Sequence, residues 1–537
     1  MSALHSVTQN ENGNLNSKSK WNVVCIIADD TDPFNLGCYG GDDFLTPHLD
    51  QLAAEGMAFM KAEVVAPVCT PSRWCYLTGK YPGRCQGRHF LETNPRDDLY
   101  NITWNTDLQP DEENLATVLR DSGYTTGYVG KFHAGRRSDE LGLQHLSFGH
   151  DPRSSQSSHA LSSNQEKILA EMKQLGWDDP RRVTWGNLDF ESSHNITTHN
   201  LEWTTEGALQ FLEDHCQDTK PFCLYYGLHT IHGPKHGENL PELDPLITAA
   251  GPVSKIPDAD MPSRQSVLDR LNQAGLDPYH RNVGALWMDD AIGAILRKVD
   301  SLGLRDNTIV IFKSDHGKFT KATLFDAGAR IPMIWRWPGK IKEGSKCHQT
   351  VQNIDFMPTL LDALGISIAD KYELDGLSYR YMLEGVVKPL REYFYNEMGM
   401  ARSIHNQRWK FVALRYKKSV INQLISGGER ALPNHIGTDC GDGTAFQRRD
   451  FFCPDQLYEI QQDRYENINL ASVDDYSEIL EMMKLKLSEV LCTFDHPFPL
   501  NPHPFQKTEL YGLMAEKAIA SNKECLGAGS FFGDRYW

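Results

Sequence analysis

The sequence has no apolar run long enough to cross a membrane, no cysteine pattern of a disulfide or zinc scaffold, and no excess of basic residues. Its clean apolar runs, such as Val23 to Ala28, are far shorter than the ~20 residues of a membrane span. Its 12 cysteines in 537 residues are scattered and form no CxxC pair. The 54 Lys and Arg against 71 Asp and Glu leave a net charge of −17, which argues against nucleic acid and anionic membranes as partners.

A secretory signal is also missing from residues 1–20, which are polar and lack a basic start followed by an apolar stretch. We expect this segment to be a disordered polar tail. With Met1 as the native start, the expected location is the cytoplasm. If Met1 is not the native start, a periplasmic or secreted location follows instead.

What is present indicates a globular protein of more than one structural unit. Hydrophobic residues make up 40% and aromatic residues 10% of the chain, enough to build a core. A length of 537 residues exceeds what a single core usually supports.

Short apolar runs alternate with helical patterns over the first 360 residues, which predicts an α/β fold. This alternation is typical of a large, mostly parallel sheet sandwiched by helices. The expected strands are Trp21–Ala28, Thr125–Gly130, Phe222–Gly227, Thr308–Lys313 and Ile331–Arg336. The expected helices are Pro47–Glu55, Glu113–Ser122, Trp203–Glu213 and Val283–Leu302.

After about residue 390 the pattern changes to short strands and one long helix. The expected strands are Glu392–Asn396, Arg408–Leu414 and Gln456–Ile460, and the helix lies near Tyr476–Leu491. We therefore predict a catalytic domain over residues 21–390. A smaller α+β subdomain with a short antiparallel sheet follows over residues 391–537 and contributes to the substrate pocket.

Three polar segments are expected to be long loops that build the walls of a pocket. They are Arg136–Ser193, Pro234–Gln265 and Lys417–Asp455.

Polar side chains follow four of the predicted strands. They are Asp29 and Asp30, Asp315 and His316, Lys131 and His133, and His229 and His232. In open parallel sheets, ligands bind beyond the carboxyl ends of the strands. Each of these residues alone has an ordinary explanation as a turn former, a helix cap or a solvated side chain. Together, the carboxylates predict a site for a hard divalent cation, with lysines and histidines beside it to hold an anion.

Cys69 precedes Pro71, which suits the first turn of a helix. The dipole at that helix N-terminus would favour an anion or a nucleophile at Cys69, and Arg73 lies one turn further on. From these residues alone, a buried structural cysteine and a nucleophile are equally supported.

The motif Cys69-Thr70-Pro71-Ser72-Arg73 with Leu77-Thr78-Gly79 resembles the signature of the type I sulfatases, the formylglycine-dependent branch of the alkaline phosphatase superfamily. Further blocks fit the family in family order, so that the resemblance covers about residues 21 to 471 outside the three long loops. They include Asp29-Asp30, Gly130-Lys131-Phe132-His133, Leu228-His229-Thr230-Ile231-His232, Ser314-Asp315-His316-Gly317 and Lys321-Ala322-Thr323-Leu324-Phe325-Asp326.

The resemblance implies a sulfuric ester hydrolase in which Cys69 is oxidised to formylglycine by a maturation enzyme. The hydrated aldehyde is a geminal diol: one hydroxyl attacks sulfur, and the other later expels sulfate. It also implies that Asp29, Asp30, Asp315 and His316, with modified Cys69, hold a divalent metal. Calcium is favoured, although His316 departs from the Asn that is common in the family and leaves magnesium and manganese open.

The remaining site residues take their roles from the same resemblance. Lys131 and Lys321 would bind the sulfate, Arg73 would orient the diol, and His133 would hydrogen-bond its hydroxyl. His232 would protonate the leaving alcohol as the general acid.

Two further residues are substrate-binding candidates with a structural alternative. For His229, a structural role is weighed slightly above a catalytic one. For Arg330, support of the Lys321 loop together with Asp326 is the alternative to contact with the substrate.

Two other functions stay open at this point. The first is a phosphonate monoester or phosphodiester hydrolase of the same superfamily, because tetrahedral oxyanions suit the same site. The second is a catalytically silent binding protein, which the complete set of catalytic residues disfavours. The substrate is expected to be a sulfated carbohydrate, with an aryl or alkyl sulfate as the second expectation.

The aromatic terminus Ser530–Trp537 is expected to pack on its own domain or on a neighbouring subunit, which leaves a homo-oligomer open.

Overall fold

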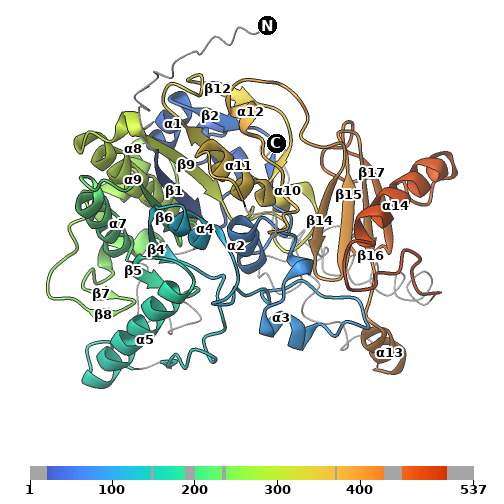
Figure 1. Ribbon diagram of the computed structural model, residues 1–537, viewed down its shortest axis with the longest axis horizontal. Coiled ribbons are helices and arrows are strands. Elements are labelled where there is room, and N and C mark those ends of the chain that lie inside the picture. Colours follow the sequence, from blue (N-terminus) through green and yellow to red (C-terminus); the bar gives the residue numbers. More distant parts are fainter. Residues whose placement is uncertain are drawn as a thin grey trace, which may run out of the picture.

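The computed structural model describes residues 21–146, 150–187, 200–232, 237–368, 372–427 and 450–504. Its centre is an eight-stranded sheet in the order β12-β2-β11-β9-β1-β6-β4-β5 (Figure 1). The strands are β1 (Asn22–Ala28), β2 (Met57–Phe59), β4 (Thr125–Lys131), β5 (Asp179–Thr184), β6 (Phe222–Gly227), β9 (Thr308–Ser314), β11 (Met333–Arg336) and β12 (Ser345–Cys347). The five strands β9-β1-β6-β4-β5 are mutually parallel, and β11 is antiparallel to both of its neighbours. The predicted α/β fold is confirmed.

Helices cover both faces of this sheet. One face carries α2 (Cys69–Thr78), α4 (Leu115–Asp121), α5 (Ser155–Gln174) and α11 (Phe356–Ala363). The other carries α1 (Pro47–Ala54), α7 (Leu201–His215), α8 (Arg264–Gln273) and α9 (His280–Ser301). Successive residues of β1 from Val23 to Ala28 alternate between the two cores, because side chains of a strand point to opposite faces. Both faces of β1 are thus buried, as a continuous apolar run predicts.

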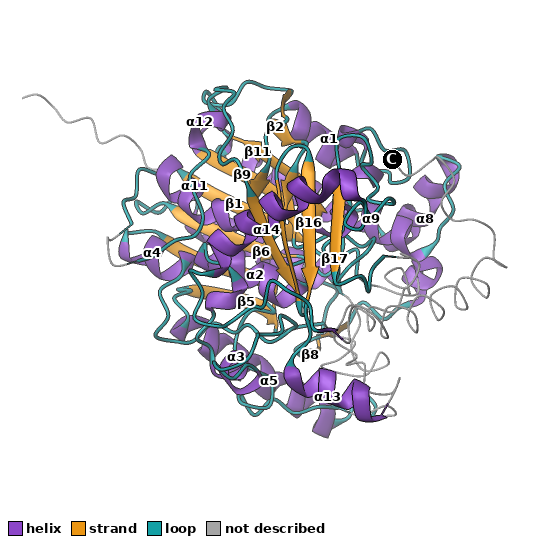
Figure 2. Ribbon diagram, turned by 90° about the vertical axis from the view of Figure 1, so that its right-hand side faces the viewer, coloured by secondary structure: helices purple, strands orange, loops and turns teal. Residues whose placement is uncertain are grey.

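A second, four-stranded sheet lies apart from the large one (Figure 1). It is antiparallel, in the order β14 (Phe394–Met398), β15 (Ala401–His405), β16 (Trp409–Leu414) and β17 (Asp455–Glu459). Helix α14 (Ser477–Leu491) packs against this sheet (Figure 2). The three strands and the long helix predicted after residue 390 are present, and β15 is an addition. The domain boundary at residue 390 stays a prediction.

The remaining strands and α-helices of the described residues are short. They are β3 (Ala62–Glu63), β7 (Ile247–Thr248), β8 (Gly251–Pro252), β10 (Arg330–Ile331), β13 (Val351–Gln352), α3 (Arg88–Thr93), α10 (Asp326–Ala329), α12 (Arg380–Leu383) and α13 (Lys418–Gly427). No helix of the described residues is long and apolar enough to cross a membrane. The ten described cysteines are free thiols, in line with the absence of a disulfide pattern.

The three expected long loops contain regular structure, so that prediction was wrong. Arg136–Ser193 holds the 20-residue helix α5 and the strand β5. Pro234–Gln265 holds the hairpin β7–β8 and the start of α8, and Lys417–Asp455 holds α13. The polar composition of Arg136–Ser193 suggested a loop because α5 buries only a narrow stripe of residues and β5 lies at the edge of the sheet. The predicted tail 1–20 and the terminus Ser530–Trp537 lie outside the described residues.

Candidate active site

The functional residues meet where the parallel strands end. Strands β9, β1, β6 and β4 are neighbours, so the residues that follow them share one edge of the sheet. Backbone hydrogen bonds continue the pairing past the strand ends: Asp315 N donates to Ala28 O at 3.0 Å, and Asp29 N donates to Thr230 O at 2.9 Å. The loops of Asp29, Asp315 and His232 are therefore held in register with one another.

Cys69 begins helix α2 and lies fully buried among these residues. Its Sγ is 3.2 Å from Nε2 of His316, 3.6 Å from Oδ1 of Asp29 and 3.9 Å from Nζ of Lys321. Burial and Asp29 raise the pKa of this thiol, but Lys131, Lys321 and His316 outweigh them and bring it to about 7. The geometry thus favours the chemical role over a purely structural cysteine.

Arg73 is buried one helical turn beyond Cys69 and hydrogen-bonds to residues at the ends of two strands. Its Nε donates to Oδ2 of Asp315 at 2.9 Å, and its Nη1 donates to the carbonyl of Lys131 at 2.9 Å. A guanidinium fits such a fork because its donors are fixed in one plane. Arg73 therefore ties α2 to β9 and β4 at the site.

Four of the five predicted metal ligands form a compact group. One ligand atom from each of Asp29, Cys69, Asp315 and His316 lies within 4.8 Å of the others, and all four residues are buried. Burial, followed by the charge of Asp29, raises the pKa of Asp315 to about 7. A divalent cation would relieve this repulsion, so the donor set fits a metal ion.

His316 is oriented as a metal-binding imidazole. Its Nδ1 lies 3.0 Å from the carbonyl of Gly317, which leaves Nε2 facing Cys69 and Asp315. A backbone carbonyl on the second ring nitrogen is a common arrangement around a bound metal. Burial lowers the pKa of His316, but Asp315 and Cys69 together outweigh it and raise this pKa to about 9, so a proton would compete with a metal ion at Nε2.

Asp30, the fifth predicted ligand, has a different immediate surrounding. Its Oδ1 accepts a hydrogen bond from Nζ of Lys321 at 2.7 Å, and Nζ of Lys318 lies 3.7 Å from its Oδ2. Oδ1 is also 3.4 Å from Nδ1 of His316, which keeps Asp30 at the border of the four-residue group. Its role as a ligand stays a prediction.

Both predicted sulfate-binding lysines are buried next to the carboxylates. Nζ of Lys131 donates to Asp29, and Nζ of Lys321 donates to Asp30. The strand pairing of β4 with β5 shifts between Val129 and Gly130, a bulge of the kind that re-aims a side chain next to a site. Two fixed cations beside the thiol therefore create a place for an anion.

The predicted histidines differ in their surroundings. His133 lies just beyond β4, and its Nδ1 is buried with no hydrogen-bond partner among the described residues. Nε2 of His232 lies 3.4 Å from Nδ2 of Asn187, and burial lowers the pKa of His232 to about 3, against the opposing charges of Asp30 and Asp29. Nε2 of His229 lies 2.6 Å from the hydroxyl of Thr184, a contact that fits a structural role.

Arg330 is engaged away from the four-residue group. Its guanidinium pairs with Asp326 at 2.6 and 2.9 Å and donates to the carbonyl of Met60 at 3.1 Å. This arrangement fits the supporting role. Contact between Arg330 and a substrate stays a prediction.

Several site residues hold a left-handed backbone that non-glycine residues rarely adopt. Asp30 has φ 55°, His133 has φ 53°, and Thr320 and Ala322, on either side of Lys321, have φ 52° and 63°. Such a conformation costs about 1–3 kcal/mol per residue and tends to occur at functional sites. Here it aims the side chains that the sequence motifs single out.

Two residues of the site were not predicted from the sequence. Asn187 accepts a hydrogen bond from Lys131 and faces His232. Lys318 lies near Asp30. Asn187 follows β5, a strand whose polar sequence hid it, so no strand-end signal pointed to it. Lys318 stands two residues after His316 and could have been found from that motif.

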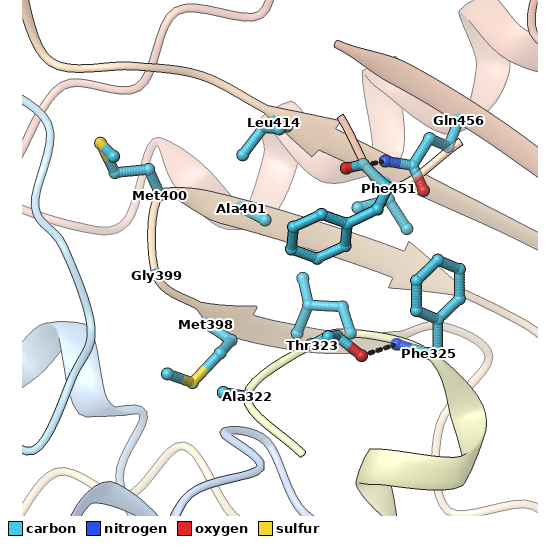
Figure 3. Close-up of a pocket in the computed structure, with 12 residues that line it drawn as sticks. Ala322, Thr323, Phe325, Met398, Gly399, Met400, Ala401, Leu414, Phe451 and Gln456 are labelled. Carbon is cyan, nitrogen blue, oxygen red and sulfur yellow. Dashed lines mark hydrogen bonds between the residues drawn. The ribbon is translucent and has the colours of Figure 1, made fainter. Parts of the chain in front are cut away.

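An apolar pocket lies between the Lys321 loop and the four-stranded sheet, shown in Figure 3. Thr323 and Phe325 line it from the loop, and Met398, Met400 and Phe451 line it from the C-terminal part. The carboxamide of Gln456 donates to main-chain carbonyls of Phe451 and Cys453 and so offers no free donor to a sulfate. The pocket therefore marks where the small sheet supports the Lys321 loop.

A family model described as Sulfatase matches residues 21–366, more than half of the chain. The chain belongs to the sulfatase family. A second model, described as N-sulphoglucosamine sulphohydrolase, C-terminal, matches residues 314–422. The resemblance seen in the motifs is thereby confirmed, and the family is one of sulfuric ester hydrolases that use a metal ion and formylglycine.

Individual sulfatases match over much of their length. An ulvan-active sulfatase of Formosa agariphila is 31% identical over 67% of this chain and 65% of its own. Arylsulfatase A of Bos taurus is 27% identical over 95% of both chains. An N-acetylgalactosamine-6-O-sulfatase of Bacteroides thetaiotaomicron is 24% identical over 90% of this chain and 97% of its own.

Solved structures share the fold at lower sequence identity. One, solved in complex with its substrate D-glucosamine-2-N,6-O-disulfate, has a TM-score of 0.57 at 18% identity and covers 90% of this chain and 99% of its own. The phosphonate monoester hydrolase of Agrobacterium radiobacter has a TM-score of 0.56 at 18% identity, covering 88% and 96%. These likenesses show a sulfatase-like fold.

Proposed function

We propose that the chain hydrolyses a sulfate ester of a carbohydrate, with Cys69 as the residue converted to formylglycine. The observation that carries this proposal is the burial of Cys69 against Asp29, His316 and Lys321 in one compact group. Aryl or alkyl sulfates are the second substrate class. Conversion of Cys69 makes a maturation enzyme a partner of the chain.

The relatives support a carbohydrate as the substrate class. Their names refer to ulvan and to N-acetylgalactosamine 6-sulfate, and a similar structure holds a disulfated glucosamine. The match of residues 314–422 to a model of an amino-sugar sulfohydrolase points in the same direction.

The divalent metal is proposed to be calcium, held by Asp29, Asp30, Asp315 and His316 with modified Cys69. A carboxylate-rich set suits a hard cation. When bound, the metal would act as a Lewis acid and the hydrated formylglycine would supply the nucleophilic hydroxyl.

The other side chains bind, orient and protonate. Lys131 and Lys321 hold the non-bridging sulfate oxygens, where negative charge must be stabilised. Arg73 and His133 keep residue 69 in position. His232 gives a proton to the leaving alcohol; an anionic sulfate beside it would raise its pKa and so favour the protonated form that this role needs.

The test is mass spectrometry of the tryptic peptide 62–73 from the native source. Formylglycine makes this peptide roughly 18 Da lighter than the unmodified thiol form. A kinetic panel of sulfate, phosphate and phosphonate esters then identifies the preferred oxyanion. An alkylatable thiol at Cys69 as the sole species would overturn the proposal and favour a silent scaffold or a thiol-based hydrolase.

A phosphonate monoester hydrolase is the second candidate, because such an enzyme shares the fold and Cys69 with its neighbours suits any tetrahedral oxyanion. Higher kcat/KM on phosphonate than on sulfate monoesters in the same panel would favour it.

Metal analysis, followed by chelation and reconstitution with calcium, magnesium or manganese, tests the identity of the metal. Calcium should restore the highest activity.

A further inference from the structure

The carboxamide of Asn187 lies between two residues that the proposed reaction uses. Its Oδ1 accepts a hydrogen bond from Nζ of Lys131, and its Nδ2 lies 3.4 Å from Nε2 of His232. The residue is 8% exposed. It thus spans the space between the cation that holds sulfate and the acid that serves the leaving group.

The orientation of this carboxamide follows from donor and acceptor chemistry. A lysine ammonium has only donors, so the oxygen of Asn187 must face Lys131. The amide N–H groups consequently face His232, and Nε2 of that imidazole is the acceptor. The contact with Lys131 therefore fixes the orientation of the carboxamide, because a flipped carboxamide would lose this hydrogen bond.

The segment that carries Asn187 is fastened to the segment that carries Lys131. Phe132 N donates to Thr184 O at 2.9 Å, and His133 N donates to Trp185 O at 2.7 Å. The indole Nε1 of Trp185 donates to the carbonyl of Arg136 at 2.6 Å. These bonds extend the β4–β5 pairing past the strand ends, so Asn187 and Lys131 form one rigid unit.

The same segment contacts the loop after β6 at two points. The hydroxyl of Thr184 lies 2.6 Å from Nε2 of His229. Three positions further along each segment, Asn187 faces His232. A side chain can be held to sub-ångström precision only when such outer contacts lock its rotamer. Residues 184–187 therefore tie the loop of His232 to Lys131 beyond the point where the direct pairing of β4 with β6 ends.

We propose that Asn187 is a positioning residue that sets the separation of Lys131 and His232, so that both act on the same ester. This inference rests on the proposed function. Lys131 would hold a non-bridging oxygen while His232 faces the bridging oxygen of that sulfate. Asn187 would hold Nε2 of His232 in place before the substrate binds, and the bridging oxygen of the substrate would then take the place of the amide at Nε2.

The test compares leaving groups in Asn187→Ala. A leaving group such as 4-nitrophenol needs little protonation, whereas a sugar or alkyl alcohol depends on the acid, which is worth about 10²–10⁴-fold. We expect kcat to fall about 100-fold or more on the sugar or alkyl sulfate and about tenfold or less on 4-nitrophenyl sulfate. The dependence of rate on leaving-group pKa across substituted phenyl sulfates should steepen accordingly.

The controls are Asn164→Ala and Asn187→Ser. Asn164, on α5, bonds to both main-chain groups of Gln144 and should leave both rates unchanged when replaced. Asn187→Ser keeps a polar group and serves if the alanine variant fails to fold. Equal losses on both substrates, or no loss, would overturn the inference.

The wild-type rates separate this inference from the proposed function. If the wild-type protein cleaves aryl phosphonates and no sulfate ester, the proposed function fails. The same leaving-group series on phosphonates then decides the role of Asn187. A wild-type protein that is loaded with metal and formylglycine and cleaves neither ester overturns both.

Discussion

The two sheets both bury charged residues, but they use them differently. At the edge of the parallel sheet, Asp29 has Lys131, Cys69 and Arg73 within 4 Å, and burial and Asp29 raise the pKa of Asp315 to about 7. Around the antiparallel sheet the charged residues form ion pairs with opposite charges, such as Lys410 of β16 with Glu466 at 2.5 Å. Charged groups that crowd together and shift one another's pKa are typical of an active site. Ion pairs between opposite charges stabilise the fold instead.

The difference follows from strand direction. Parallel strands end at the same edge, so the residues after β9, β1, β6 and β4 converge on one spot. In an antiparallel sheet, successive strands end at opposite edges, and the charged residues are spread out. Arg415, for example, pairs with Asp455 at 2.6 Å and donates to main-chain carbonyls, and Lys484 lies 3.3 Å from the other oxygen of Asp455.

The largest effect is expected from Cys69→Ala, which removes the residue proposed to become the nucleophile. Activity should fall at least about 10⁴-fold, as for other enzymes that lose a covalent nucleophile. Cys75→Ala, on the same helix and equally buried, should change kcat less than about twofold and cost about 1–2 kcal/mol of stability. Steady-state kinetics of both variants would show a general role for α2 if Cys75→Ala were equally inactive.

A matched pair of lysine variants tests the comparison directly. Lys321→Met should lower kcat by about 10²–10³-fold, because it removes charge stabilisation from the site. Lys410→Met leaves Glu466 buried and unpaired, which should cost about 3–5 kcal/mol of unfolding free energy while kcat changes less than about threefold. Steady-state kinetics of both variants measure kcat, and denaturant unfolding measures their free energies of unfolding. A comparable loss of kcat in Lys410→Met would mean that the small sheet shapes the site itself.

The ion pair between β3 and the antiparallel sheet predicts a pH effect. Burial would raise the pKa of Glu63, but His405 of β15, 2.9 Å away, brings it below the usual 4.5. A carboxyl with a lowered folded-state pKa contributes stability above its unfolded pKa, and this contribution is lost as the pH falls through the folded value. Glu63→Gln should therefore cost about 1–2 kcal/mol at pH 6 and progressively less below about pH 4.5. Thermal unfolding of wild type and variant from pH 3 to 7 measures this difference in stability. A difference that does not change with pH would contradict the prediction.

The smallest effect is expected from Arg330→Gln. The pair of Arg330 with Asp326 is about 30% exposed, so its loss should cost about 1 kcal/mol or less. If the residue only supports the Lys321 loop, KM should change less than about twofold. A tenfold rise in KM with unchanged kcat would establish Arg330 as substrate-binding instead.

The strands that frame the site could be predicted because they are buried on both faces. Runs such as Val23 to Ala28 and Ile309 to Phe312 are continuously apolar, and such runs identify central parallel strands. The polar residues directly after them, Asp29 and Asp315, were then candidates by position alone. The motif around Cys69 added the chemistry.

Elements with little apolar surface could not be predicted in the same way. Helix α5 opens with several serines and buries only a few residues, among them Leu161, Ile168 and Met172. Strand β5 has two arginines because it is an edge strand. With β5 unrecognised, Asn187 had no place in the expected site, although it touches Lys131.

Local sequence was sufficient for the kinds of groups at the site, because strand periodicity and the Cys69 motif depend only on neighbours in the chain. It could not say which partner each group takes. Asp29 and Asp30 are adjacent in sequence, yet Lys131 bonds to the first and Lys321 to the second. Those choices depend on the order β9-β1-β6-β4 and on loops hundreds of residues apart, which only the folded chain brings within hydrogen-bonding distance.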